Sequence, residues 1–105
     1  MDKREAIIKL LRYKELLKEH FDLDRLILFG SYANGHPHKD SDIDVAIVVK
    51  AAPGDYFFYA PLLWKLRRQV DDRIEPILFE KGKDESGFLS EILRNGIEVK
   101  TGAEF

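Results

Sequence analysis

The chain has 105 residues, which is enough for one domain and too few for two. Hydrophobic residues make up 45% and charged residues 34%, with a formal net charge of −2, so no basic field is present to gather a nucleic-acid backbone. Cysteine is absent, which excludes disulfides, thiolate metal sites and thiol nucleophiles.

The amino-terminal residues 1–21 carry charges every few positions and lack the apolar core of a signal peptide. No apolar run reaches the length that spans a membrane. The sequence therefore predicts a single cytoplasmic domain over residues 1–105, with no membrane contact and no direct contact with nucleic acid.

The first half of the chain predicts a helix followed by two strands. Residues 3–20 repeat apolar side chains at helical spacing, and Asp2 can cap the start of that helix. An apolar run at 25–29 ends at Gly30 and predicts a buried strand. After a loop rich in turn formers, the β-branched stretch DIDVAIVV at 42–49 is the clearest strand pattern in the chain.

The second half predicts two more helices and two more strands. Residues 56–70 are aromatic and then helical, 73–79 predict a strand, and 97–100 predict a last short strand. Between these strands a helix is expected, with Ser86 as its N-cap and Gly96 as its end. Strands that alternate with helices predict an α/β or α+β domain in which helices cover one face of a sheet.

Two aspartates stand one residue apart where the clearest strand begins. Side chains alternate along a strand, so Asp42 and Asp44 share one face, about 6.6 Å apart, and the β-branched residues face the other way. Like charges on one face repel each other unless a cation lies between them, and Mg²⁺ binds carboxylate oxygens while keeping positions open for phosphate. The pair predicts a metal site for phosphoryl or nucleotidyl transfer. The plainer interpretation is a turn cap formed by Asp42 with Ser41 and a solvent-facing Asp44.

Gly30 and Ser31 end the preceding strand, and a short helical turn is expected after Ser31. Backbone N–H groups at such a turn suit a phosphate, Gly30 lets the backbone approach it, and Ser31 can donate its hydroxyl. Most Gly-Ser pairs only end a strand. Here ten residues separate the pair from Asp42, so a phosphate-binding turn and a metal site on neighbouring strands outline a nucleoside triphosphate site.

The segment LFGSYANG…SDIDVAIVV resembles the minimal nucleotidyltransferases (MNT) of the DNA polymerase beta superfamily, whose signature is Gly-Ser, ten residues and Asp-x-Asp. The resemblance extends over nearly the whole chain. It implies the polymerase-beta-type fold, a mixed four-stranded sheet with helices packed mainly on one face and the acidic site on the other. It also implies a third carboxylate on a later strand, which Glu75 supplies. The alternative for Glu75 is an exposed residue paired with Arg73, and Pro76 beside it implies an edge strand or a bulge.

Basic residues are missing at two positions, Tyr32 and Asn34, near which many members of the family carry arginine. Lys39 and the two neighbouring histidines in the following loop are expected to offer charge or hydrogen-bond donors to the triphosphate. Ser41 adds a further hydroxyl. The expected nucleotide-binding residues are Gly30, Ser31, Lys39 and Ser41.

The resemblance implies a reaction that uses ATP as substrate and Mg²⁺ as cofactor, with two ions. Asp42, Asp44 and Glu75 are the implied catalytic residues and metal ligands, with Glu75 as third ligand or as base for the incoming hydroxyl. AMP would pass to that hydroxyl and pyrophosphate would leave. A stand-alone MNT protein resembles the antitoxin of a HEPN–MNT toxin–antitoxin pair, which adenylylates a tyrosine of the HEPN toxin. A HEPN-type toxin is therefore the implied partner.

Aromatic side chains are in surplus over residues 56–64. Only some of the apolar residues of this helix fall on one stripe that can face the core, namely Tyr59, Leu63, Leu66 and Val70. Phe57, Phe58 and Trp64 do not all fit that stripe, so they either fill the edge of the core or form a protein interface. A base-stacking platform ranks below both because the chain is acidic. Pro61 is tolerable in this helix if it falls in the first turn.

Two other functions stay open at this point. The chain can be a non-catalytic module that masks its partner, or an aminoglycoside-type small-molecule nucleotidyltransferase in which a homodimer supplies the missing wall of the substrate site. Mg²⁺-dependent pyrophosphate release in the presence of the partner separates the enzyme from the masking module. A screen of hydroxylated small molecules as acceptors separates the two kinds of transferase.

Overall fold

The computed structural model describes residues 1–38, 40–52 and 54–100. Three helices and four strands follow one another in these residues. They are α1 (Lys3–Lys18), β1 (Leu23–Phe29), β2 (Ile43–Val49), α2 (Tyr56–Arg67), β3 (Ile74–Glu80), α3 (Phe88–Asn95) and β4 (Ile97–Glu98). Every helix and strand that the sequence predicts is present, with ends that differ by a few residues.

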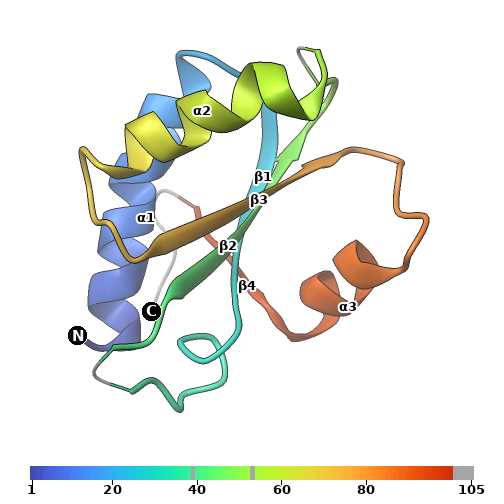
Figure 1. Cartoon of the computed structure of the whole chain (residues 1–105). Helices are drawn as coiled ribbons and strands as arrows, with labels where there is room; N and C mark the ends of the chain where they lie inside the picture. Colours follow the sequence, from blue (N-terminus) through green and yellow to red (C-terminus); the bar gives the residue numbers. More distant parts are fainter. Residues whose placement is uncertain (39, 53, 101–105) are drawn as a thin grey trace.

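The strands form one mixed sheet in the order β3-β2-β1-β4 (Figure 1). β1 is antiparallel to both β2 and β4, whereas β3 is parallel to β2. The parallel pair requires a crossover, which α2 provides between β2 and β3. The mixed four-stranded sheet that the resemblance implies is confirmed.

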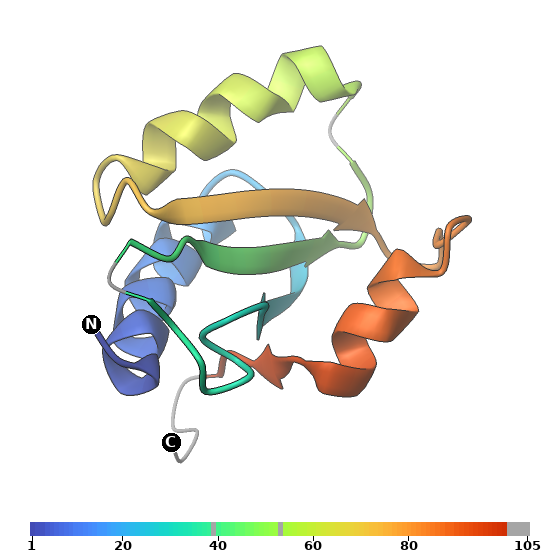
Figure 2. The same cartoon turned by 60° about the horizontal axis from the view of Figure 1, so that its bottom comes forward.

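Helices lie on both faces of this sheet. Figures 1 and 2 show α1 and α2 on one side and α3 on the other. The larger core lies under α1 and α2, and β2 contributes to it the β-branched residues Ile43, Val45, Ile47 and Val49. The alternation expected along β2 is therefore confirmed. None of the helices in the described parts of the chain has the length and apolarity needed to cross a membrane.

The helix α1 is bound to the rest of the core by apolar packing and by polar contacts. Its buried residues recur at helical spacing: Ala6, Ile7, Leu10, Tyr13 and Leu17. The Asp2 side chain caps its start by accepting a hydrogen bond from the Glu5 backbone N–H at 2.9 Å. The Tyr13 hydroxyl donates to the Leu63 carbonyl of α2 at 3.0 Å, and Lys9 pairs with Asp71 at 2.6 Å.

A smaller apolar cluster lies under α3, on the face that carries Asp44. It joins two buried residues of α3 to three from the sheet: Leu89, Ile92, Ile27, Ala46 and Val48. In β2 the last two follow Asp44 at positions of the same parity. The helix α3 thus covers the part of this face that Ala46 and Val48 form. The end of the face at Asp44 is not covered by any helix of the described residues.

The start of α3 differs from the expectation. Gly87, not Ser86, occupies the N-cap position, with φ of 76°. The Asp84 carboxylate accepts hydrogen bonds from the backbone N–H groups of Leu89 and Ser90, each at 2.9 Å, so a residue further upstream satisfies the helix start. The predicted end at Gly96 is confirmed.

The two prolines inside regular elements are tolerated for different reasons. Pro61 is the sixth residue of α2 and not part of its first turn, so the condition given for tolerating it is not met. The N–H that it lacks would have bonded to the carbonyl of Phe57, and both residues are exposed, so water can reach this stretch. Pro76 lies on β3, which is an edge strand as predicted.

Backbone parity explains why Pro76 does not interrupt the sheet. Ile43 donates its N–H to the Arg73 carbonyl, and Lys81 donates its N–H to the Val49 carbonyl. Odd-numbered residues of this stretch therefore point their backbone groups toward β2, and the even-numbered Pro76 points away from it. Its missing N–H costs no hydrogen bond of the sheet.

Candidate active site

Asp44 lies on β2 between two strands that place a side chain beside it. Its register partners are Phe29 on β1 and Glu75 on the parallel strand β3. Burial raises the pKa of the half-buried Asp44 carboxyl, and the negative charges of Asp42 and Glu75 raise this pKa further. The fold therefore brings together the three carboxylates that the sequence singled out, two that are one residue apart on one chain segment and one from a neighbouring strand.

These carboxylates do not form a closed metal cage. Among residues 1–38, 40–52 and 54–100, no three His, Asp or Glu side chains are arranged to hold a metal ion by themselves. Glu75 Oε1 lies 3.8 Å from Arg67 Nη1, so an ion pair directs it toward α2. Asp42 and Asp44 fit a divalent cation as a pair of adjacent oxygen donors. Glu75 fits as a third donor if its carboxylate turns away from Arg67.

The ion pair of Glu75 departs from the alternative that the sequence suggested. Arg73 does not pair with Glu75; its guanidinium binds Asp71 at 2.9 Å instead. Arg73 precedes the first residue of β3, so the alternation of a strand does not apply to it. Arg67 also stacks on the ring of Trp64, with its Cζ 4.2 Å from the ring centroid.

Gly30 allows the turn after β1 to approach Asp44 closely. Its φ is +74°, and a β-carbon built on it would overlap the Asp44 carboxylate, 3.2 Å from Cγ. The Asn34 N–H donates to the Gly30 carbonyl and the His36 N–H donates to the Ser31 carbonyl, each at 3.0 Å. The expected helical turn is thus a compact turn over residues 30–35 that holds Ser31 beside the aspartates' end of the sheet.

The remaining candidates of this loop have different surroundings. Tyr32 is fully buried in the larger core, so a basic residue there would put a charge into apolar surroundings. Asn34 is exposed. The Ser41 hydroxyl oxygen accepts a hydrogen bond from the His38 backbone N–H at 2.6 Å, which orders the loop just before Asp42. Lys39 lies outside the described residues.

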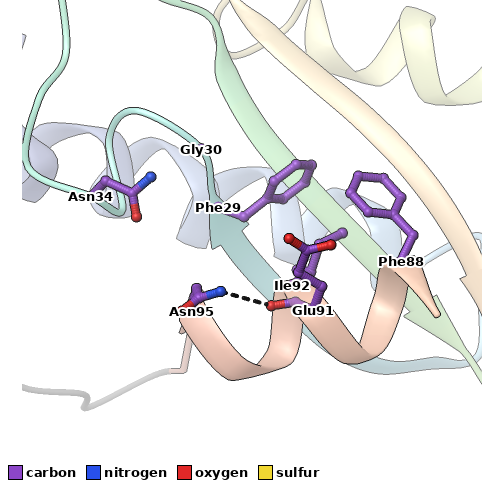
Figure 3. Close-up of a pocket in the computed structure, with 7 residues that line it drawn as sticks. All are labelled: Phe29, Gly30, Asn34, Phe88, Glu91, Ile92 and Asn95. Carbon is purple, nitrogen blue, oxygen red and sulfur yellow. Dashed lines mark hydrogen bonds between the residues drawn. The ribbon is translucent and has the colours of Figure 1, made fainter.

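A pocket opens directly beside Gly30, between the turn and α3 (Figure 3). Its volume is about 150 Å³. The turn and the end of β1 contribute Phe29, Gly30 and Asn34; α3 contributes Phe88, Glu91, Ile92 and Asn95. The sequence carries no signal for these α3 residues, because only the sheet order brings α3 beside β1.

The aromatic start of α2 lies largely in solvent. Phe57 is 85% exposed and Phe58 is 73% exposed, so the interpretation that they fill the edge of the core is wrong. Of the predicted stripe, Leu63 and Leu66 are buried. A groove of about 360 Å³ runs between α2 and β3, and Trp64 is among the residues that line it.

Comparison with known proteins decides the family. Residues 12–104 match the family described as "Polymerase beta, Nucleotidyltransferase". The chain belongs to this nucleotidyltransferase family. A relative from Methanocaldococcus jannaschii, named "Putative protein adenylyltransferase MJ0141", is 37% identical over 79 residues, which cover 73% of this chain and 79% of the relative.

Two solved structures that the chain is similar to are of toxin–antitoxin proteins. One is a crystal structure of a toxin–antitoxin with AMP-PNP; it is 25% identical, has a TM-score of 0.65, and the match covers 90% of this chain and 72% of that chain. The other is a mutant of the MntA–HpeT toxin–antitoxin, 26% identical with a TM-score of 0.61, over 83% of this chain and 68% of that chain. The MNT resemblance is thereby confirmed, and the family implies a nucleotide substrate and typically a divalent metal ion.

Proposed function

We propose that this nucleotidyltransferase moves AMP from ATP onto a tyrosine hydroxyl of a HEPN-type toxin, and that it acts as the antitoxin of that pair. The observation that carries the proposal is the register of Asp44 with Glu75, together with the Gly30 turn packed against the Asp44 carboxylate. This arrangement joins a phosphate-binding turn to an acidic site. The named relative and the toxin–antitoxin structures support the choice of a protein acceptor.

The acidic residues would hold Mg²⁺, which neutralises phosphate charge and orients the reacting groups when bound. Asp42 and Asp44 are its proposed ligands, and two ions fit the family's chemistry. Gly30 and Ser31 would hold the β- and γ-phosphates through backbone N–H groups and the serine hydroxyl. Ser41 and Lys39 remain proposed contributors to nucleotide binding from the adjoining loop.

The transfer step needs positioning and one proton acceptor. The acceptor oxygen bonds to the α-phosphorus of ATP, the bond from that phosphorus to the α–β bridging oxygen breaks, and pyrophosphate leaves with the electron pair. Glu75 takes the hydroxyl proton and passes it to water. The protein itself forms no covalent intermediate, so alignment of the two oxygens supplies much of the rate.

The partner surface is proposed on α2. Phe57 and Phe58 are exposed aromatic residues, Tyr56 is 59% exposed beside them, and Arg67 and Trp64 stack next to the groove at the edge of β3. Aromatic residues and arginine are enriched at the centres of protein interfaces. Because Arg67 also pairs with Glu75, a partner seated on this groove would contact a side chain that reaches the acidic site.

The test begins with the neighbouring reading frame, where the proposal expects a gene for a HEPN-type toxin. The purified toxin is incubated with this chain, Mg²⁺ and ATP, and its intact mass is measured. We expect the toxin to gain one or more AMP units, and peptide mapping should place them on tyrosine. If the toxin binds tightly but gains no mass, the chain masks its partner; if only small hydroxylated molecules gain AMP, the acceptor class is wrong.

A further inference from the structure

We propose that the pocket between the Gly30 turn and α3 receives the base of the nucleoside triphosphate, with Phe88 against the face of the base and Glu91 accepting from an exocyclic amino group. This inference rests on the proposed nucleotide site and extends it to base recognition. The pocket shares Gly30 with the phosphate-binding turn, so a ligand held by that turn can extend into it.

The walls of the pocket favour a flat aromatic ligand. Phe29 and Phe88 meet edge to face, with ring centroids 6.0 Å apart and an interplanar angle of 89°. Phe79 also contacts Phe88, with ring centroids 6.1 Å apart, so the Phe88 ring is supported and still 40% exposed. A supported but exposed ring beside a phosphate site is a stacking surface, because every base presents a π-face.

The polar groups of the pocket favour a base over another phosphate. Figure 3 shows the Glu91 carboxylate beside the Phe29 ring and Asn34 across from it on the turn. A carboxylate in the wall repels phosphate but accepts hydrogen bonds from an amino group. Asn95 donates to the Glu91 backbone carbonyl at 3.4 Å, which leaves its side-chain oxygen able to accept as well. Acceptors at the wall select an amino-bearing base such as adenine over its 6-oxo counterpart.

The first experiment measures binding of Mg²⁺-ATP and of Mg²⁺-tripolyphosphate by calorimetry to the whole chain and to Phe88→Ala. We expect Phe88→Ala to weaken ATP binding about tenfold or more and to leave tripolyphosphate binding unchanged. Leu93→Ala is the matched control, since Leu93 lies on the same helix, is 41% exposed and lines a different pocket. Leu93→Ala should leave the binding of both probes unchanged.

The second experiment tests the amino group. The whole chain should bind ATP more tightly than ITP, in which a carbonyl replaces the amino group, and Glu91→Gln should narrow that ratio because an amide can donate to the carbonyl. Thermal unfolding checks that each variant folds. The base pocket is overturned if Phe88→Ala loses affinity for ATP and for tripolyphosphate equally. It is also overturned if Glu91→Gln leaves the ratio of ATP affinity to ITP affinity unchanged. Failure of the parent chain to bind either probe overturns the nucleotide site itself.

Discussion

The two faces of the sheet differ in the side chains that they carry. Under α1 and α2 the face is fully apolar, and β2 presents only buried β-branched residues to it. The opposite face carries Ala46 and Val48 under α3 and then Asp44 beyond the helix, half-buried with two carboxylates near it. One strand thus contributes one face to the larger core and an opposite face that carries Asp44, whose carboxyl pKa is raised where the apolar cluster under α3 ends.

The difference shows how a small domain places charge without losing its core. The two carboxylates that act on the Asp44 carboxyl, those of Asp42 and Glu75, carry the same negative charge and therefore disfavour its ionised form. Such like-charge repulsion is expected at the cation and phosphate site proposed here, and the larger core has to offset its cost. The following substitutions test this difference between the two faces, from the largest expected effect to the smallest.

Asp44→Asn should abolish function on the face that carries Asp44. The change keeps the shape of the side chain but removes one charge from the proposed metal site, so AMP transfer should fall by at least about a hundredfold, which is about 2.7 kcal/mol of barrier. Without metal and nucleotide the variant should be as stable as the parent or slightly more stable, because repulsion is relieved. Transfer is followed by mass spectrometry and stability by thermal unfolding. A clearly destabilised metal-free variant would show that the carboxylate is structural.

Ile47→Ala should damage the face that belongs to the larger core instead. Ile47 is fully buried on β2, so its truncation should cost about 2–5 kcal/mol of unfolding free energy, measured by urea denaturation. Ile92→Ala, in the smaller cluster under α3, should fall at the lower end of that range because fewer neighbours surround it. Equal costs at both sites would contradict the asymmetry between the faces.

Gly30→Ala should affect both stability and activity. The new β-carbon would overlap the Asp44 carboxylate and adopt a left-handed φ, so we expect a loss of about 1–3 kcal/mol and displacement of Asp44. Gly35→Ala is the matched control, since Gly35 has a φ of +77° and nothing within 4 Å of a built β-carbon. Both substitutions place alanine at a left-handed φ, so the difference between their losses of unfolding free energy and of AMP transfer measures the clash with the Asp44 carboxylate alone. Identical losses would argue against it.

Asp71 should make the stability of the fold sensitive to acid. Hydrogen bonds from Arg73 and Lys9 lower the pKa of Asp71 well below its usual range. Its contribution is therefore complete above about pH 4, the unfolded-state pKa, and is lost as the pH falls further, because the unfolded chain takes up the proton first. Asp71→Asn should cost about 1–3 kcal/mol at pH 7 and less at pH 3. A cost that is independent of pH would contradict this assignment.

Phe57→Ala should leave the fold almost unchanged. The side chain is 85% exposed, so the unfolding free energy should stay within about 0.5 kcal/mol of the parent. Partner binding, measured by calorimetry with the toxin, should weaken by up to a few kcal/mol if Phe57 is a hot spot. Ile8→Ala, which removes a side chain that is 52% exposed on α1 and not on α2, is the control and should leave partner binding unchanged. Normal binding by Phe57→Ala would remove this residue from the partner surface.

The sequence by itself determined the elements and one side of the site. Period-2 alternation in 42–49 sorted Asp44 from Ile43 and Val45 because each residue of a strand must face one side of the sheet. The spacing of Gly30 from Asp42 placed a turn at the end of one strand and two carboxylates at the start of the next, where Asp42 directly precedes β2 and Asp44 is its second residue. These inferences depend only on local geometry, and their structural content holds in the fold.

The tertiary structure decided what meets across elements. The parallel pairing of β3 put Glu75 beside Asp44, and Arg67 rather than Arg73 reached Glu75 because α2 packs along the edge strand. The position of α3 created the pocket next to Gly30. The same packing left Phe57 in solvent, although its composition suits a core as well as a surface. Such contacts join residues distant in sequence, and only the packing of helices on the sheet specifies them.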